Sequence, residues 1–119
     1  MISNFLTNYW PVILVAAFIG WRLFRFRKVR MQIPQLLEKG ALIIDVRNPD
    51  EFLAGANPIS MNVPLGQIDS RTKNLDRNKT LILCCASGTR SAMAVAAFKA
   101  LGFKNVINAG PWTNTLVKG

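Results

Sequence analysis

The chain has 119 residues, which is enough for one domain and a tail. It contains no histidine, so Ser-His-Asp and Cys-His catalysis are excluded, as is any zinc site that requires imidazole. The only two cysteines, Cys84 and Cys85, are adjacent, which argues against a disulfide framework and against a structural metal site. We therefore expect neither a metal nor another cofactor.

The net charge of +9 is unevenly distributed along the chain. Five of the fifteen basic residues form one short segment, here called the basic block: Arg22, Arg25, Arg27, Lys28 and Arg30. From residue 31 onward, ten basic and six acidic side chains leave a charge of only +4. Because this part also lacks a helix-turn-helix pattern, zinc-finger spacing and a nucleic-acid-binding aromatic motif, we expect no nucleic-acid partner.

The N-terminal residues are apolar enough to predict a transmembrane helix. No charged residue precedes Arg22, and residues 5–24 supply about the twenty residues that a bilayer core requires. A cleaved secretory signal would carry basic residues before its apolar stretch, whereas here the basic block follows it. A domain of about 90 residues is also too small to bury such a helix in its core. We predict an uncleaved anchor over residues 1–30 and one domain over residues 31–119.

The charges that flank the apolar stretch predict its orientation. Its N-terminal side has no Lys or Arg, whereas the basic block lies on its C-terminal side. By the positive-inside rule, the domain faces the cytoplasm, and two free thiols agree with a reducing compartment. The basic block is also suited to anionic lipid, although a role in topology alone is the simpler interpretation.

The remaining residues alternate between patterns typical of strands and of helices. Strands are predicted over residues 41–44, 59–63, 80–85 and 105–107. Helices are predicted over residues 34–39, 48–53 and 91–101, with a helical turn over 65–71 and a short helix from Pro111 onward. Strands that alternate with helices indicate an α/β domain whose mostly parallel sheet is covered by helices on both faces.

One loop carries the pattern of a reactive site. Cys85 ends a predicted strand, and ligands of open parallel sheets bind beyond the carboxyl ends of the strands. The loop that follows consists of Ala86, Ser87, Gly88 and Thr89. Small residues allow successive N–H groups to converge on one centre, which lowers a thiol pKa from about 8.5 to about 3.5–7.5. Arg90 adds a fixed charge that can hold an anion through two N–H groups, so we predict a nucleophilic thiolate at Cys85.

Three motifs in this domain resemble those of the rhodanese family. They are Asp45-Val46-Arg47, Glu51-Phe52-x-x-Gly55 and Cys85-x-Ser87-Gly88-x-Arg90-Ser91. The resemblance continues in order through Asn62-Val63-Pro64, Gly102-Phe103-x-x-Val106 and Gly110-x-Trp112, and it spans about residues 32–116. One departure is Ala56-Asn57, where family members commonly carry a His-Ile pair, and we expect it to affect local packing.

The resemblance implies a five-stranded α/β sheet and a cysteine that cycles through a persulfide. A small sulfur-containing anion such as thiosulfate would donate sulfur to Cys85, and a thiol, cyanide or the thiol of a protein would accept it. The backbone amides from Ala86 to Arg90 would stabilise the negative sulfur, and Arg90 would bind the sulfonate-like end of the donor. Three residues are expected to support this site: Asp45, Arg47 and Ser91.

The adjacent cysteines leave two assignments of the loop open. Counted from Cys84, the spacing Cys-x5-Arg resembles the loop of phosphatases and arsenate reductases, whereas Cys-x4-Arg from Cys85 resembles that of sulfurtransferases. Both kinds of loop tend to place a glycine three residues after the nucleophile, and Gly88 therefore favours Cys85. Cys84 is interpreted as a buried strand residue, with a resolving thiol as the alternative.

Local spacing also predicts contacts around the loop. Asp45 is expected either to bond to the loop or to be solvated at its strand end. Arg47 and Glu51 are four residues apart and are expected to pair, while Trp112 is interpreted as a packing residue.

Three functions remain as hypotheses. The first is a membrane-anchored sulfurtransferase that uses Cys85. The second is a catalytically silent binding or redox-sensing module of the same fold, and the third is arsenate or phosphate-ester chemistry from Cys84.

Overall fold

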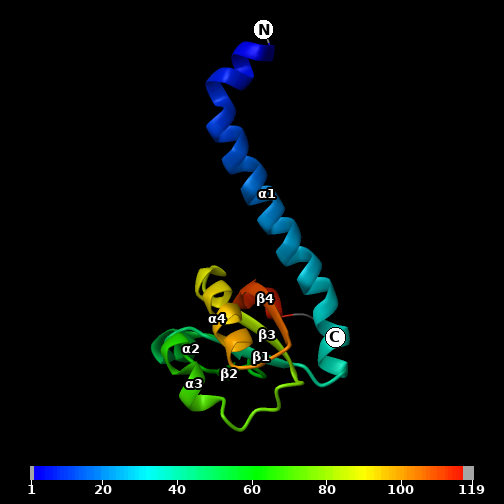
Figure 1. Cartoon of the computed structure of the whole chain (residues 1–119), viewed down its shortest axis with the longest axis vertical. Coiled ribbons are helices and arrows are strands. Elements are labelled where there is room, and N and C mark those ends of the chain that lie inside the picture. The colour runs from blue at the N-terminus through cyan, green and yellow to red at the C-terminus, as the bar shows by residue number, and fades with distance from the viewer. Residues whose placement is uncertain (1, 117–119) are drawn as a thin grey trace.

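The computed structural model describes residues 2–116, with side chains described from Asn4 onward. Its centre is a sheet of four parallel strands in the order β2-β1-β3-β4 (Figure 1). The strands are β1 (Leu42–Asp45), β2 (Met61–Asn62), β3 (Thr80–Cys85) and β4 (Asn105–Pro111). All four strand patterns in the sequence are therefore present, although β4 is longer and β2 shorter than predicted.

Helices connect and cover these strands. The α-helices are α1 (Ile2–Glu38), α2 (Pro49–Ala54), α3 (Ile68–Arg71) and α4 (Thr89–Ala100). Two 3-10 helices complete the chain, η1 (Leu65–Gln67) and η2 (Trp112–Thr115). The observed helices agree with the predicted α/β class, in which crossover connections join parallel strands.

The two faces of the sheet bury alternate residues of each strand. In β3, Leu81, Leu83 and Cys85 point toward the core that includes Phe98 of α4. Ile82 and Cys84 point to the opposite core, which is covered by α1. This period of two is the expected consequence of strand geometry, and it places the two cysteine side chains on opposite faces of the sheet.

Helix α1 belongs to both the predicted anchor and the predicted domain. It continues without interruption to Glu38, so Pro34 lies inside it and does not begin a separate helix. Proline removes one backbone hydrogen bond from a helix. The packing of Val29, Ile33 and Leu37 against the sheet compensates for this loss and keeps the chain helical past Pro34. The helix ends before Gly40, whose φ of 93° suits glycine. The boundary between residues 30 and 31 stays a prediction.

The fifth strand that the family resemblance implied is absent from the described residues. The segment before β1 has its apolar residues at helical spacing, with Ile33 fully buried and Leu36 and Leu37 packed against the same core. Those residues form α1, so no further strand pairs with β4, which contacts α1. The prediction of five strands was therefore wrong.

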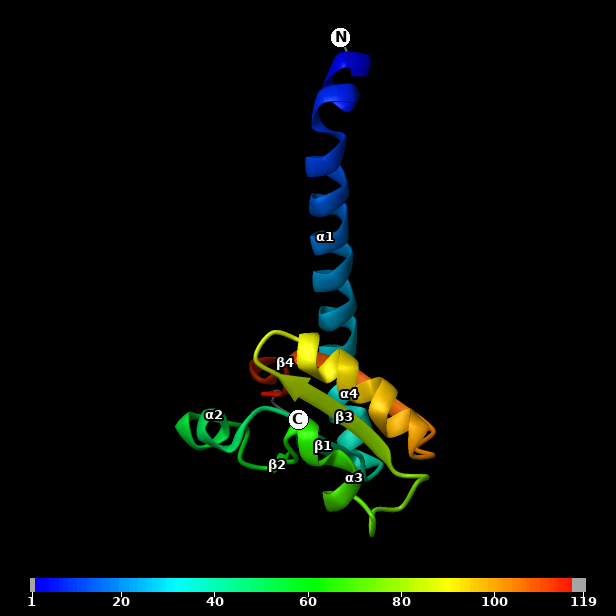
Figure 2. The ribbon, with the colours of Figure 1, turned by 60° about the vertical axis from the view of Figure 1, so that its left-hand side comes forward.

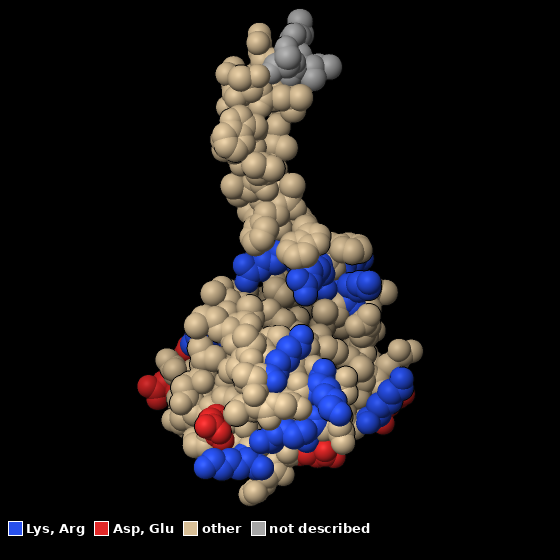
Figure 3. All heavy atoms as spheres, in the orientation of Figure 1, with Lys and Arg blue, Asp and Glu red and all other residues tan. Residues whose placement is uncertain are grey.

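The N-terminal part of α1 projects away from the domain (Figures 1 and 2). Residues Asn4–Glu38 form a helix long and apolar enough to cross a membrane, and none of its apolar window is buried. Length and composition alone do not distinguish such a helix from a signal sequence or a core helix. Lys and Arg side chains gather at its base, where it meets the domain (Figure 3).

Candidate active site

The loop between β3 and α4 surrounds the sulfur of Cys85 with hydrogen-bond donors. The Gly88 N–H donates to Cys85 Sγ at 2.9 Å, and the Ser91 N–H donates at 3.4 Å. The Ser91 hydroxyl oxygen also lies 3.4 Å from the sulfur. Gly88 reaches this position with a φ of 100°, which a residue with a Cβ rarely adopts. The loop thus directs the N–H groups of Gly88 and Ser91 at one centre, the Cys85 sulfur.

These contacts determine the ionisation of Cys85. Burial raises the pKa of this thiol, but the Ser91 hydroxyl and the N–H groups of Ser91, Gly88 and Ser87 favour the thiolate. The second effect is larger, so the pKa of Cys85 lies below its ordinary value. The site therefore has the electrostatic character of a nucleophilic cysteine.

Cys84 has the opposite environment. Its side chain is fully buried between the sheet and α1, together with Ile82 and Ile33. Burial, reinforced by the carboxylate of Asp45, raises the pKa of Cys84 far above its ordinary value. The donors of the loop point to Cys85, and Cys84 faces away from them, which argues against both the longer phosphatase-type loop and a resolving thiol.

A polar network connects the loop to β4. Ser91 Oγ lies 2.6 Å from Asn108 Oδ1 and 3.1 Å from the carbonyl oxygen of Gly88. Asn108 also donates to that carbonyl and accepts the N–H of Gly110 at 2.9 Å. Sequence reasoning missed Asn108, because its contact depends on the pairing of β4 with β3 and on the irregular register between Leu83 and Cys84.

The remaining loop residues lie at its rim. Ala86, Ser87 and Thr89 are exposed, whereas Gly88 is buried. Arg90 donates to both carboxylate oxygens of Glu51, at 2.6 and 2.9 Å. This pairing lowers the pKa of Glu51 to about 2. The cation predicted to bind the donor is therefore already paired.

Contrary to the sequence prediction, Arg47 does not form an ion pair with Glu51, although its Nη1 donates to the Glu51 main-chain carbonyl oxygen at 3.4 Å. Arg47 precedes the first residue of α2, Pro49, so the helical spacing of four residues does not apply. Its guanidinium pairs with the carboxylate of Asp45 at 2.7 Å and donates to the Gly55 carbonyl oxygen at 2.8 Å. Both side chains are buried, and together they fix the corner between β1 and α2.

Asp45 accordingly has a structural role that the sequence did not indicate. Its carboxylate accepts hydrogen bonds from both the main chain and the side chain of Arg47, so neither expected alternative, the loop or solvent, is its partner. Trp112 packs over the Arg47 guanidinium at 5.0 Å, which agrees with its interpretation as a packing residue. The departure at Asn57 is accommodated by hydrogen bonds from its amide to Thr115.

Helix α1 also contacts the loop, which sequence reasoning did not predict. Arg22 Nη2 donates to the carbonyl oxygen of Ser87 at 3.0 Å. A pocket of about 250 Å³ lies between this part of α1 and the loop, and Arg22, Arg25, Gly88 and Thr89 are among its lining residues.

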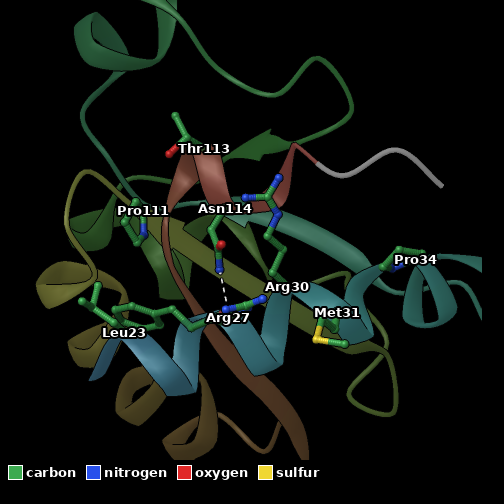
Figure 4. A pocket seen from close by; sticks show the side chains of 9 residues that line it. Leu23, Arg27, Arg30, Met31, Pro34, Pro111, Thr113 and Asn114 are labelled. Carbon is green, nitrogen blue, oxygen red and sulfur yellow. Dashed lines mark hydrogen bonds between the residues drawn. The ribbon is translucent and has the colours of Figure 1, made fainter. Parts of the chain in front are cut away.

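A larger pocket of about 790 Å³ lies between α1 and η2 (Figure 4). Arg27, Arg30 and Asn114 line it together with apolar residues, and the Asn114 amide donates to the Phe26 carbonyl oxygen at 2.9 Å. None of residues 85–90 lines this pocket. Chemistry, not pocket size, therefore identifies the candidate site. Among the described residues, no cluster of three His, Cys, Asp or Glu side chains is placed to hold a metal ion.

Comparisons with known proteins identify the family of the domain. Residues 31–109 match the family described as Rhodanese-like domain. A putative mitochondrial thiosulfate sulfurtransferase of Schizosaccharomyces pombe is 37% identical over 89 residues, which cover 63% of each chain. The present chain spans less than two thirds of the length of this relative and of two further sulfur-transfer relatives.

The solved structures and one longer match extend the comparison. A rhodanese with anions from E. coli superimposes with a TM-score of 0.60 at 29% identity, over 67% of this chain and 100% of that one. An uncharacterized protein of Bacillus subtilis is 27% identical over 110 residues, 87% of each chain. Because 87% of this chain is more than residues 31–119 contain, the similarity extends into the part of α1 that precedes residue 31.

Proposed function

Because this chain belongs to the rhodanese-like domain family, we propose that it is a membrane-anchored sulfurtransferase that carries sulfane sulfur on Cys85. The observation that carries this proposal is the buried Cys85 sulfur with the N–H groups of Gly88 and Ser91 directed at it. Sulfur transfer is named for relatives of this chain, among them a thiosulfate sulfurtransferase of Pseudomonas syringae.

The first step forms the persulfide. The Cys85 thiolate attacks the sulfane sulfur of thiosulfate, a new S–S bond forms, and the bond to the sulfonate sulfur breaks. Sulfite leaves with the bonding electron pair, and Cys85 keeps the transferred sulfur as a persulfide anion. The N–H groups of the loop stabilise the negative charge on sulfur before and after the transfer, because they are fixed in place before the reaction begins.

The second step regenerates the enzyme. A thiolate or cyanide attacks the outer sulfur of the persulfide, and the electron pair of the broken S–S bond returns to Cys85. The product is a new persulfide or thiocyanate. A protein thiol is a further acceptor class, and the exposed rim at Ala86, Ser87 and Thr89 offers the access that it requires.

Intact mass spectrometry tests the first step. The full chain in a neutral detergent is incubated with thiosulfate, and a gain of one sulfur atom is expected. Cys84→Ser is the matched control and should still gain sulfur, whereas Cys85→Ser should not. The full chain is required because Ile33 and Leu37 of α1 belong to the core. If the wild-type chain gains no sulfur, the sulfurtransferase proposal fails and the silent binding module is favoured.

The anchoring proposal rests on α1. Its residues before Arg22 carry no charge, and the basic block follows directly; by the positive-inside rule, this asymmetry favours a cytoplasmic location of the domain. Alkaline carbonate extraction of membranes should leave the full chain in the pellet. Protease added to sealed vesicles should degrade the domain only in the inside-out preparation, and protection there would contradict the orientation.

A further inference from the structure

Helix α1 is fitted to the active-site loop through its aromatic and basic side chains. Arg22, Phe26 and Val29 are partly buried and Ile33 is fully buried, while most neighbouring positions on the helix are exposed. Their spacing of three and four residues defines one face of a helix. This face begins at the loop and continues over the sheet, so α1 is part of the site as well as the candidate anchor.

Two glycines allow the close approach of Phe26. A Cβ atom on Gly88 would lie 2.9 Å from the ring of Phe26, and a Cβ on Gly110 would lie 2.9 Å from the same ring. Real side chains do not tolerate contacts of this length. The ring therefore occupies space that exists only because both facing residues lack side chains, and it fixes α1 against the loop.

Arg22 is positioned by this contact at the rim of the loop. Its guanidinium lies 5.5 Å from the centre of the Phe26 ring and donates one hydrogen bond to the Ser87 carbonyl oxygen. Nη2 lies 3.0 Å from the position of a Cβ on Gly88. The Ser87 carbonyl that accepts from Arg22 and the Gly88 N–H that donates to Cys85 Sγ belong to the same peptide group, so one peptide group lies between this guanidinium and the reactive sulfur.

The charges around the loop are unequal on its two sides. On the side of α2, Glu51 neutralises Arg90 through a two-pronged ion pair. On the side of α1, Arg22 and Arg25 line the pocket of about 250 Å³, and the ion pairs of the described residues involve neither of them. The pocket therefore presents two cations beside the loop, with four further N–H groups on Arg22 free of the Ser87 bond.

We propose that this pocket is the anion subsite of the active site, in which Arg22, with Arg25 beside it, binds the sulfonate-type end of the sulfur donor. The proposal rests on the sulfurtransferase function. It assigns to Arg22 the donor-binding role that the resemblance gave to Arg90, and it makes Arg22 a substrate-binding residue that sets the affinity for anionic donors. The planar guanidinium suits such an end because it offers parallel N–H groups.

Kinetics of the full chain in neutral detergent test this subsite. Arg22→Gln should raise the KM for thiosulfate by about tenfold, the effect of losing about one charge-assisted hydrogen bond, and change kcat by less than about twofold. Arg30→Gln is the matched control, because it removes the same charge from the same helix but lines the other pocket. Arg22→Lys should recover part of the affinity. Equal KM values for Arg22→Gln and Arg30→Gln would overturn the proposal.

A second readout does not depend on turnover. The alkylation rate of Cys85, measured on its peptide, is compared for iodoacetate, which is anionic, and iodoacetamide, which is neutral. Arg22→Gln should slow iodoacetate several-fold and leave iodoacetamide unchanged, which also shows that the loop is intact. If the wild type gains no sulfur but this selectivity is present, the proposed function fails and the anion subsite stands. If Arg22→Gln affects only binding to vesicles that contain anionic lipid, the side chain binds headgroups and the subsite is refuted.

Discussion

Replacing Gly88 by alanine perturbs the loop and the docking of α1 together. The backbone at this position has a φ of 100°, and a residue with a Cβ there costs about 1–2 kcal/mol. The new Cβ would also lie 2.9 Å from the Phe26 ring and 3.2 Å from Gly110 Cα. Overpacking of this kind costs about 1–3 kcal/mol. We therefore expect Gly88→Ala to lower the free energy of unfolding by about 2–5 kcal/mol.

Thermal unfolding of the full chain in neutral detergent, followed by near-UV circular dichroism, measures this loss. For a domain of this size, the change corresponds to a decrease in Tm of about 10 °C or more. Gly66→Ala is the matched control, since a Cβ there meets no atom within 4 Å and the residue has no positive φ. Its effect should stay within about 0.5 kcal/mol.

A double-mutant cycle separates the two costs of Gly88→Ala. Phe26→Ala removes the ring that the new Cβ would meet at 2.9 Å, so most of the packing cost should disappear, while the backbone cost and the contact with Gly110 Cα remain. The coupling between the two substitutions should therefore be about 1–3 kcal/mol. If Gly88→Ala is no more destabilising than Gly66→Ala, the geometry described for the loop is incorrect. If the effects of the two substitutions are strictly additive, the contact between the Phe26 ring and Gly88 is refuted, but the backbone geometry of the loop is not.

Two further predictions concern ionisable groups near the loop. Ser91→Ala removes a group that favours the thiolate, so the pKa of Cys85 should rise, and its alkylation by iodoacetamide should shift to higher pH; an unchanged profile would contradict this role. Glu51→Gln breaks the pair with Arg90. Since the pKa of Glu51 in the folded chain is about 2 and its ordinary value is 4.5, the pair stabilises the fold above pH 4.5, and this contribution is lost as the pH falls toward 2. The Tm difference between wild type and Glu51→Gln should disappear over that interval, and a constant difference would show that the charge is unimportant.

Much of the fold and the loop was predictable because the patterns that determine them are local. Strands β1 and β3 appear in the sequence as short apolar runs, and Cys85 is followed by small residues that permit a tight loop. The expectation of a fifth strand came from the family resemblance and not from an apolar run. The apolar residues before β1 have helical spacing instead. A family resemblance thus carried less structural information at that point than the residues themselves.

The contacts that sequence reasoning missed join residues far apart in the chain. Arg22 and Ser87 are separated by 65 positions, and Ser91 and Asn108 by 17. Neither pair leaves a signal in local spacing. The incorrect pairing of Arg47 with Glu51 has a different cause, because helical spacing was applied to a residue that lies before the helix.

The contact between α1 and the loop connects the two halves of the proposed function. The first charged residue after the apolar stretch is Arg22, and that same side chain bonds to the loop at Ser87. No linker therefore separates the candidate membrane segment from the site. Figure 2 shows β3 running toward the side of the domain from which α1 projects. Under the proposed anchoring, the loop is held near the headgroup layer, and a sulfur acceptor must reach Cys85 at the membrane surface.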